Sequence, residues 1–482
     1  MTTTFAACYS IAYPLSPIIY YLSPVTSSLH YPITSSPKVN NMSIAILGGG
    51  ISGLTLAWQL QKAGVAYDLF EAEATPGGCL RSLAHPAGYL LETGPNSLQL
   101  SDELQELLTE LDLTDKIQDA ADVSKHRYVL RNGRIQELPG SPPALLTSSF
   151  FSLKARFSLV RELLRPAAAP NPQETVAGFF RRRFGPELVD YAVNPFISGI
   201  YAGDPEQLLI HKTFGKVAAL EQQHGSVLRG LAKAGGGAGR KRIITLQGGI
   251  QTLTDALAAR LTHRHVGQPV QALHRLPNGH YQLRTAAGRE SQHPALVLAL
   301  PTYAAAPLLQ PLFPEAAAAL AAVHYPPMAA IYTAYQRADV SHPLNGFGAL
   351  SPKIEQPYAA GTIWTSAIFP DRAPAGQMLF TTFVGGTQYE EHARQPEATQ
   401  KAAVHAELSK LYGIREGAQP AWQFRYYWER AIPQFDHRIV AAHTAADTLQ
   451  TQNIWSAANW RGGVGVPDCI RHARQIAAQL VA

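Results

Sequence analysis

The feature that most constrains this chain is a run of glycines between two regular patterns. Residues 43–47 (SIAIL) are apolar and β-branched, as in a short buried strand, and lead directly into residues 48–53 (GGGISG). A helical pattern follows and stops at Gly64, and the next strand, 65–70, ends on Glu71. This order of strand, turn, helix, strand and acid predicts a nucleotide-binding fold. A glycine-rich turn in an unrelated α/β fold is the alternative.

The residues of the motif have distinct physical tasks. Gly48 allows a tight turn, Gly50 lets the backbone approach a pyrophosphate, and Gly53 permits close packing of the helix on the strand. The exposed N–H groups at the helix start, where Ser52 lies, are expected to bind the phosphates. Glu71 is placed to accept from a pair of ribose hydroxyls.

A second glycine pair, Gly77-Gly78, follows the ribose acid closely. Together with the stretch 91–96 (LETGPN), this pair resembles the second fingerprint of the FAD proteins that are similar to glutathione reductase. The resemblance implies that the glycines pass close to the cofactor and that an arginine, here Arg81, supports its phosphates. Cys79 stands where that family often has a larger residue or an arginine, and a structural cysteine is the simplest interpretation.

The C-terminal end of the chain repeats the pattern of glycines before a helix. Residues 454–460 are predicted to form a last buried strand, and the glycine-rich residues 461–470 (RGGVGVPDCI) lead into a closing helix over 470–481. The positive end of a helix dipole suits the electron-rich N1–C2=O edge of a reduced flavin. The sequence therefore predicts a discontinuous FAD domain whose two ends meet around one cofactor.

Composition excludes several other classes of protein. The 482 residues are 46% apolar and 16% charged, which is typical of a globular chain, and no window is apolar enough to predict a membrane-spanning helix. The net charge of +5 is too mild for a dedicated nucleic-acid binder. Three widely spaced cysteines predict neither a disulfide framework nor a zinc site, and they fit a reducing cytosol.

The first 41 residues differ from the rest. They contain no Asp, Glu or Arg, and Lys38 is their only lysine. They lack the long apolar core of a secretory signal and the arginines of a mitochondrial transit peptide. Because Met42 stands directly before the first predicted strand, we expect residues 1–41 to be a non-native or unused extension without a stable fold.

Taken together, these residues resemble the oxygen-dependent protoporphyrinogen oxidases, a family of FAD enzymes, over most of 42–482. The two glycine-rich ends would fit any relative of the flavin amine oxidases. The other stretches are more specific to the family: LETGPNS (91–97), KHRYVLRNG (125–133), HGSVLRG (224–230), QGGIQTL (247–253), NPFISGIYAGDPEQL (194–208), FPDRAPAG (369–376) and TTFVGGT (381–387). The last three of these are the most discriminating.

The resemblance implies an α/β fold in which a discontinuous Rossmann FAD domain, similar to that of glutathione reductase, accompanies a mixed-sheet substrate domain and a mainly helical domain that faces a membrane. The predicted boundaries are 42–100, 243–302 and 436–482 for the FAD domain, 101–212 for the helical domain, and 213–242 with 303–435 for the substrate domain.

The implied reaction is the six-electron oxidation of protoporphyrinogen IX to protoporphyrin IX in haem biosynthesis, with O2 reduced to H2O2. The flavin carries this chemistry, so no catalytic side chain and no metal site is expected. Coproporphyrinogen III is the alternative substrate. A flavin amine oxidase, a carotenoid desaturase and a flavin-binding module without turnover are more distant alternatives.

The resemblance also carries roles over to single residues. Arg127 matches an arginine that faces a substrate propionate, and guanidinium geometry suits bidentate carboxylate binding. The other substrate positions are Gly199, Leu350, Ile363, Phe383 and Asn96, where the family usually has Leu at Ile363. The implied cofactor positions are Gly48, Gly50, Ser52, Gly53, Glu71, Gly77, Gly78, Arg81, Gly94, Pro95, Val270, Trp460, Gly465, Val466 and Pro467.

One further segment has the pattern of a basic amphipathic helix. Its apolar residues, at spacings of three and four, are Phe150, Leu153, Phe157, Val160 and Leu164. The charged residues between them are Lys154, Arg156, Arg161, Arg165 and the single acid Glu162. Such a helix is predicted to lie on a membrane surface, and a helix packed on the protein core is the alternative.

The expected partners are a porphyrinogen and O2, without nucleic acid. The expected location is the cytoplasm, with peripheral attachment to the inner membrane face left open. The resemblance also leaves open a homodimer and hand-over of the product to ferrochelatase.

Overall fold

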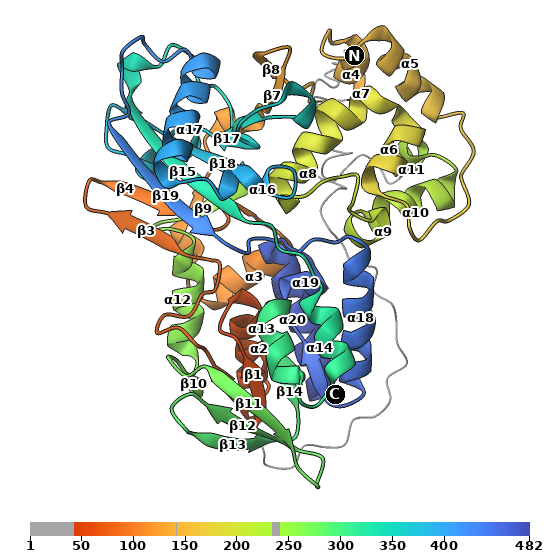
Figure 1. Cartoon of the computed structure of the whole chain (residues 1–482), viewed down its shortest axis with the longest axis vertical. Coiled ribbons are helices and arrows are strands. Elements are labelled where there is room, and N and C mark those ends of the chain that lie inside the picture. The colour runs from red at the N-terminus through yellow and green to blue at the C-terminus, as the bar shows by residue number, and fades with distance from the viewer. Residues whose placement is uncertain (1–42, 141, 234–241) are drawn as a thin grey trace, which may run out of the picture.

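The computed structural model describes residues 43–140, 142–233 and 242–482 (Figure 1). The expectation for residues 1–41 falls outside these ranges. At the centre of the lower half lies a parallel five-stranded sheet in the order β10-β2-β1-β14-β20 (Figure 1). Its strands are β10 (Arg264–His265), β2 (Tyr67–Phe70), β1 (Ile44–Leu47), β14 (Leu296–Leu298) and β20 (Ile454–Ser456).

The central strand β1 is buried on both faces, as expected for a parallel sheet. Ile44 and Ile46 belong to the core formed with α2 (Ile51–Lys62), α3 (Asp102–Glu110), α12 (Gln251–Arg260) and α20 (Val466–Val481). Ala45 and Leu47 belong to a second core, which includes α13 (Thr302–Leu309), α14 (Pro314–Ala321) and α18 (His437–Gln450). The period-two alternation of β1 therefore distributes helices to both faces of the sheet.

Three small antiparallel sheets border this unit. The first is the hairpin of β3 (Ser82–His85) and β4 (Tyr89–Glu92), and the second joins β5 (Leu98–Gln99), β9 (Ile243–Leu246) and β6 (Ile117–Asp119). The third consists of β11 (Val270–Arg275), β12 (Tyr281–Thr285) and β13 (Glu290–His293). A register shift between Val270 and Ala272 marks an irregularity at the start of β11.

A seven-stranded mixed sheet forms the upper left of the molecule, in the order β19-β15-β18-β17-β16-β7-β8 (Figure 1). The strands are β19 (Trp422–Trp428), β15 (Met328–Gln336), β18 (Gln377–Gly385), β17 (Gly361–Ile363), β16 (Gly348–Leu350), β7 (Tyr128–Arg131) and β8 (Arg134–Glu137). The short helices α15 (Thr365–Ile368) and α16 (Glu390–Ala393) and the longer α17 (Glu397–Tyr412) accompany it.

The upper right of the molecule is helical (Figure 1). Its core contains the buried aromatic side chains Phe179, Phe180 and Phe184 of α6. The helices are α4 (Pro142–Thr147), α5 (Leu153–Glu162), α6 (Val176–Phe184), α7 (Pro186–Leu188), α8 (Asn194–Tyr201), α9 (Ile210–Thr213), α10 (Gly215–His224) and α11 (Val227–Lys233). A five-residue π-helix, Val189–Val193, precedes α8.

Several local expectations are confirmed and others are corrected. Helix α2 ends at Lys62, and Gly64 has φ +69° just after it, as its place at a helix C-terminus predicted. The predicted last strand, 454–460, is instead β20 followed by the short helix α19 (Asn459–Gly462). The closing helix begins at Val466 rather than residue 470, since Pro467 is well tolerated in a first helical turn.

The elements cross the predicted domain boundaries in three places. Strands β7 and β8 belong to the segment predicted to be mainly helical, but they pair into the seven-stranded sheet. Helix α3 comes from the same segment and joins the core of the five-stranded sheet. Helices α13 and α14, predicted within the substrate domain, also pack in the lower half of the molecule (Figure 1). The division into domains stays a prediction.

Candidate active site

The predicted glycine positions gather where β1 ends and α2 begins. Gly48 has φ +108°, and a Cβ there would lie 2.5 Å from the carbonyl oxygen of Ala299. A Cβ on Gly53 would lie only 2.0 Å from the carbonyl oxygen of Gly48. The space beside Gly50 is open, since its Cβ would meet only the Cα of Gly78, at 3.9 Å. Two glycines therefore close the turn, and the third leaves room for a ligand at the helix N-terminus.

Glu71 follows β2 at the same edge of the sheet. Its Oε2 accepts from the Gly49 N–H at 2.6 Å, and its Oε1 accepts from the Glu73 N–H at 2.8 Å. These two bonds fix the carboxylate beside the glycine turn. Each carboxylate oxygen has a second lone pair for a hydroxyl donor.

The second glycine pair lies against the first motif. Gly77 and Gly78 both have positive φ, and the Gly77 N–H donates to the carbonyl oxygen of Gly49 at 2.8 Å. Arg81 is half-buried and its Nε donates to the Gly78 carbonyl oxygen at 3.2 Å. The structure thus brings Gly77, Gly78 and Arg81 together with the turn after β1, as the fingerprint resemblance predicted.

The C-terminal positions approach the same edge from the other side. Gly465 caps α20, whose first residues are Val466 and Pro467, and α20 lies beside α2 (Figure 1). The side chain of Trp460 is fully buried, and its Nε1 donates to the carbonyl oxygen of Leu300 at 3.0 Å. Trp460 is thereby tied to the segment that follows β14.

The loop after β4 contacts Cys79, directly after the second glycine pair, on one side and the seven-stranded sheet on the other. A Cβ on Gly94 would lie 2.0 Å from the carbonyl oxygen of Cys79, so this position requires glycine. Asn96, two residues further, is buried and donates from Nδ2 to the Gly94 carbonyl oxygen at 3.2 Å. Its Oδ1 is buried without a hydrogen-bond partner in the described structure, as expected of a group that awaits a ligand.

Val270 begins β11 and is half-buried, opposite Thr285 of β12. Pro95 lies in the loop between Gly94 and Asn96. Three features of this edge fit a dinucleotide such as FAD: the open turn at Gly50, the oriented Glu71 carboxylate and the Asn96 oxygen without a hydrogen-bond partner in the described structure.

The predicted apolar substrate residues share one face of the seven-stranded sheet. Leu350 of β16 lies opposite Gly361, and Gly361 lies opposite Phe383 of β18. Ile363 is two residues beyond Gly361 on β17 and therefore points to the same side. Gly361 has no side chain, and the Leu350 side chain occupies the space above it, since a Cβ on Gly361 would lie 3.2 Å from Leu350 Cδ2.

Two residues that the sequence did not single out connect this face to residues 93–96, the loop after β4, which is called the flavin loop below. Register places Tyr332 of β15 and Trp428 of β19 on the same side as Phe383. The Tyr332 hydroxyl donates to the Glu92 carbonyl oxygen at 2.7 Å, and Trp428 Nε1 donates to the Thr93 carbonyl oxygen at 2.8 Å. The available signal is the aromatic alternation of β19, which does not show which loop the strand contacts.

The remaining two substrate positions lie near β16. A Cβ on Gly199 of α8 would lie 2.9 Å from Leu350 Cδ2, so this glycine allows helix and strand to approach. Arg127 directly precedes β7, the neighbour of β16, and its guanidinium carbon lies 3.9 Å from the centre of the Phe347 ring. Stacking of a guanidinium on an aromatic ring is compatible with hydrogen bonds in the guanidinium plane.

Burial keeps two titratable groups nearby, Cys469 and His443, in their neutral forms. Burial raises the pKa of the Cys469 thiol to about 12, while Cys79 is exposed and free, and Cys8 lies outside the described residues. Burial also lowers the pKa of His443 to about 3, and its neutral ring donates from Nε2 to the Trp460 carbonyl oxygen at 2.8 Å. Across the described ranges, no group of three or more His, Cys, Asp or Glu residues could hold a metal ion.

The amphipathic segment divides into a buried and an exposed part. Phe150 is buried before α5 begins, which corrects its predicted place on the exposed face, because its ring packs beside Phe151 and under Arg131. The other predicted apolar residues are exposed, with relative accessibilities of 78% for Leu153, 69% for Phe157, 48% for Val160 and 79% for Leu164. This outward apolar row is called the α5 face below.

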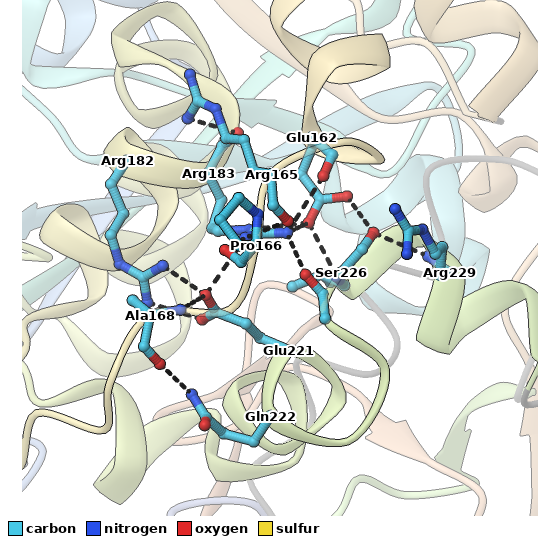
Figure 2. A network of polar contacts seen from close by, with 12 residues as sticks. Glu162, Arg165, Pro166, Ala168, Arg182, Arg183, Glu221, Gln222, Ser226 and Arg229 are labelled. Carbon is cyan, nitrogen blue, oxygen red and sulfur yellow. Dashed lines mark hydrogen bonds and ion pairs between the residues drawn. The ribbon is translucent and has the colours of Figure 1, made fainter.

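A buried ionic cluster anchors α5 from behind (Figure 2). Glu162 and Arg183 are both almost inaccessible and form an ion pair, and Arg183 also reaches Glu221 of α10 at 3.3 Å. Glu162 further accepts from the Ser226 hydroxyl at 2.6 Å and from the Val227 N–H at 2.9 Å. The only acid of the segment therefore points into the protein, away from the α5 face.

Comparison with known proteins agrees with this geometry. The model of the family described as flavin containing amine oxidoreductase matches residues 51–481. The mitochondrial protoporphyrinogen oxidase of Nicotiana tabacum is 31% identical, over 88% of this chain and 91% of its own length. The human protoporphyrinogen oxidase is 29% identical, over 91% of this chain and 98% of its own length.

Solved structures show the same fold. An Exiguobacterium protein described as a protoporphyrinogen oxidase has a TM-score of 0.76 at 22% identity, covering 92% of this chain and 99% of its own. A putrescine oxidase has a TM-score of 0.68 at 16% identity, covering 91% of this chain and 99% of its own. Fold and family model together define an FAD-dependent oxidoreductase with an α/β fold.

Within the flavin-containing amine oxidoreductases, the chain belongs to the protoporphyrinogen oxidase family. The resemblance seen in the sequence is thereby confirmed. None of the helices in the described ranges combines the length and the apolar character that crossing a membrane requires.

Proposed function

We propose that this protein oxidises protoporphyrinogen IX to protoporphyrin IX in haem biosynthesis. The observation that carries the proposal is the apolar sheet face of Leu350, Ile363 and Phe383, which Tyr332 and Trp428 join to the flavin loop. A large, hydrophobic macrocycle suits such a face better than a small amine does. The names of the curated relatives support the same substrate.

The cofactor site we propose follows the predicted positions. The N-terminus of α2, with Gly48, Gly50, Ser52 and Gly53, would hold the pyrophosphate. The dipole of α20, entered through Gly465, Val466 and Pro467, would stabilise negative charge on the reduced ring. The remaining proposed contacts are Glu71, Gly77, Gly78, Arg81, Gly94, Pro95, Val270 and Trp460.

Bound FAD would accept a hydride in each of three turnovers, and O2 would reoxidise it to give H2O2. The task of the protein is then to hold a reacting carbon at the flavin and to exclude water. Phe383, Leu350 and Ile363 would pack against the macrocycle. Gly199 would line this cavity, and the buried Asn96 Oδ1 would accept a hydrogen bond near the flavin.

Arg127 would bind a propionate through its guanidinium plane, held by the Phe347 ring. Replacing Arg127 with alanine should raise KM about 10-fold, the size expected for loss of one charge-assisted hydrogen bond, with the FAD content unchanged. The matched control is Arg134→Ala on the exposed part of β8. An unchanged KM for Arg127→Ala would remove Arg127 from the site.

Anaerobic reduction of the holoenzyme tests the function. Protoporphyrinogen IX, coproporphyrinogen III and a simple amine such as putrescine would each be mixed with the enzyme while the visible flavin absorbance is followed. We expect bleaching by protoporphyrinogen and none by the amine. Faster bleaching by coproporphyrinogen would assign the alternative substrate. Bleaching by the amine alone would assign an amine oxidase. If no substrate bleaches the flavin, although O2 reoxidises flavin that has been reduced chemically, the protein would be a flavin-binding module without turnover.

We further propose that the α5 face seats the protein peripherally on an anionic membrane at the cytoplasmic side. The support is the outward row of Leu153, Phe157, Val160 and Leu164 beside Lys154 and Arg161. A poorly soluble substrate and product would partition into the same lipid. A second copy of the chain or ferrochelatase on this face is an alternative, which crosslinking of the enzyme in the absence of lipid would reveal.

A further inference from the structure

A buried arginine links the two halves of the candidate site. Arg372 ends the short 3₁₀-helix Pro370–Arg372, which a short loop connects to strand β18, the strand that carries Phe383. Its side chain is 1% exposed. Its Nη2 lies 3.3 Å from Oε1 of Glu92, which is also buried, and donates to the Thr245 hydroxyl. The ion pair therefore joins the substrate sheet to the last residue of β4.

Glu92 is held from several directions. Its Oε2 accepts from the Ser82 hydroxyl at 2.6 Å, and its Oε1 accepts from the Ile250 N–H at 3.0 Å. Its carbonyl oxygen accepts from the Tyr332 hydroxyl. Segments that are far apart in the sequence thus meet on one residue, and the next residue, Thr93, opens the flavin loop.

Arg372 has few polar contacts apart from its pair with Glu92 and its hydrogen bond to Thr245. Nε and Nη1 of Arg372 have no hydrogen-bond partner in the described structure, although Asp371 Oδ1 lies 3.8 Å from Nε. Burial raises the pKa of Glu92, and the Arg372 charge opposes that rise. A buried carboxylate without its guanidinium would be uncompensated, so the loop that follows it should move when either partner is removed.

We propose that Arg372 and Glu92 are positioning residues, which set the flavin loop 93–96 against the apolar substrate face. The proposal rests on the proposed function for its kinetic consequence only. Transfer of a hydride depends steeply on the separation of the reacting atoms, and a displacement of about 1 Å can cost roughly 100-fold in rate. The pair would therefore act on the rate of flavin reduction rather than on substrate affinity.

The test compares Arg372→Met, Glu92→Gln and the double variant as FAD-loaded enzymes. Each single variant should slow anaerobic flavin reduction by protoporphyrinogen about 100-fold, with KM changed less than threefold, and should shift the visible flavin spectrum. The double variant should be no worse than either single variant, because no charge is left unpaired. The control is Arg242→Met, which breaks the exposed Arg242–Asp119 pair at the start of β9, the strand that carries Thr245. This variant should leave rate and spectrum unchanged.

Arg372→Lys supplies the measurement if Arg372→Met does not fold, since it keeps the charge. It should recover part of the reduction rate and most of the spectrum. Folded, FAD-loaded single variants with the wild-type rate and spectrum would overturn the proposal, as would losses that simply add in the double variant. If wild type is not reduced by protoporphyrinogen but the variants still shift the spectrum, the proposed function fails and the positioning role stands.

Discussion

Helices α20 and α5 both combine apolar and basic residues, but the apolar side of α20 is buried and that of α5 is exposed. In α20 the apolar residues Ile470 and Ala473 are buried, and Arg471 donates to Glu103 of α3 at 2.6 Å. In α5 the apolar row faces outward, and the one acid, Glu162, is buried behind it. The first helix completes a core, whereas the second is held rigidly so that its apolar side stays outside.

The difference shows that exposure of apolar side chains need not mean a loosely attached helix. Arg156 donates from Nε to the Phe151 carbonyl oxygen at 2.9 Å, and Arg165 donates to that of Arg183 at 3.1 Å. These contacts and the cluster in Figure 2 fix α5 on its inner side. A fixed apolar face is what a docking surface requires, because little order has to be gained on binding.

The largest expected effect comes from breaking the anchor. Arg183→Met removes one partner of a buried pair and should lower the free energy of unfolding by about 3–5 kcal/mol. Arg181→Met, on the same helix, breaks only the exposed pair with Glu206 and should cost less than about 1 kcal/mol. Urea unfolding of both holoenzymes measures the difference. Equal losses would contradict an anchoring role for the cluster.

The next effect concerns the α5 face itself. Phe157→Asp should weaken binding to anionic liposomes by about 10- to 100-fold, because burial of one large apolar side chain contributes about 1.5–3 kcal/mol. Its free energy of unfolding should change by less than about 0.5 kcal/mol, since the side chain has little to lose. Flotation at low salt measures binding. Ile354→Asp, which alters another exposed apolar residue, is the control, and an equal loss there would argue against a specific face.

The smallest effect is expected at the paired arginine of α20. Burial works against ionisation of Glu103, but the hydrogen bonds from Arg471, its own backbone N–H and Ser101, with the Arg471 charge, together outweigh it and lower the pKa to about 2 from its ordinary 4.5. The stabilisation is therefore complete above about pH 4.5 and is lost as the pH falls through 2. Because this site is partly exposed, we expect about 1 kcal/mol.

Glu103→Gln should flatten the acid limb of the stability curve in that window and leave the rest of the curve parallel. Acid unfolding followed by circular dichroism between pH 5 and pH 2 measures this. A variant curve as steep as that of wild type would show that the pair contributes nothing.

The sequence predicted best what depends on neighbouring residues. The turn at Gly48 and Gly53 and the end of α2 near Gly64 are local events with strong backbone requirements, and they could be located without a structure. The end of the chain was harder. Residues 454–460 are mostly apolar, and their pattern does not show that the strand stops at Ser456 and that Trp460 belongs to a short helix.

Contacts between distant segments could not be predicted. Nothing in residues 128–137 indicates that they pair with β16, and nothing in the proline-rich stretch around Arg372 indicates a buried ion pair. Phe150 fits the amphipathic spacing of α5, and only the arrangement of Arg131 and Phe151 around it decides that it is buried. The roles of the site residues came from the family resemblance and stay proposals.

The order of strands in the parallel sheet has a consequence for how the chain is made. Strand β14 pairs with β1 on one side and with β20 on the other, and α20 covers the face above β1. During synthesis the nucleotide-binding sheet would stay incomplete, with an open edge and an uncovered apolar surface, until β20 and α20 have left the ribosome. We therefore expect nascent chains that lack β20 and α20 to depend on chaperones and to acquire the flavin only after both elements have joined the sheet.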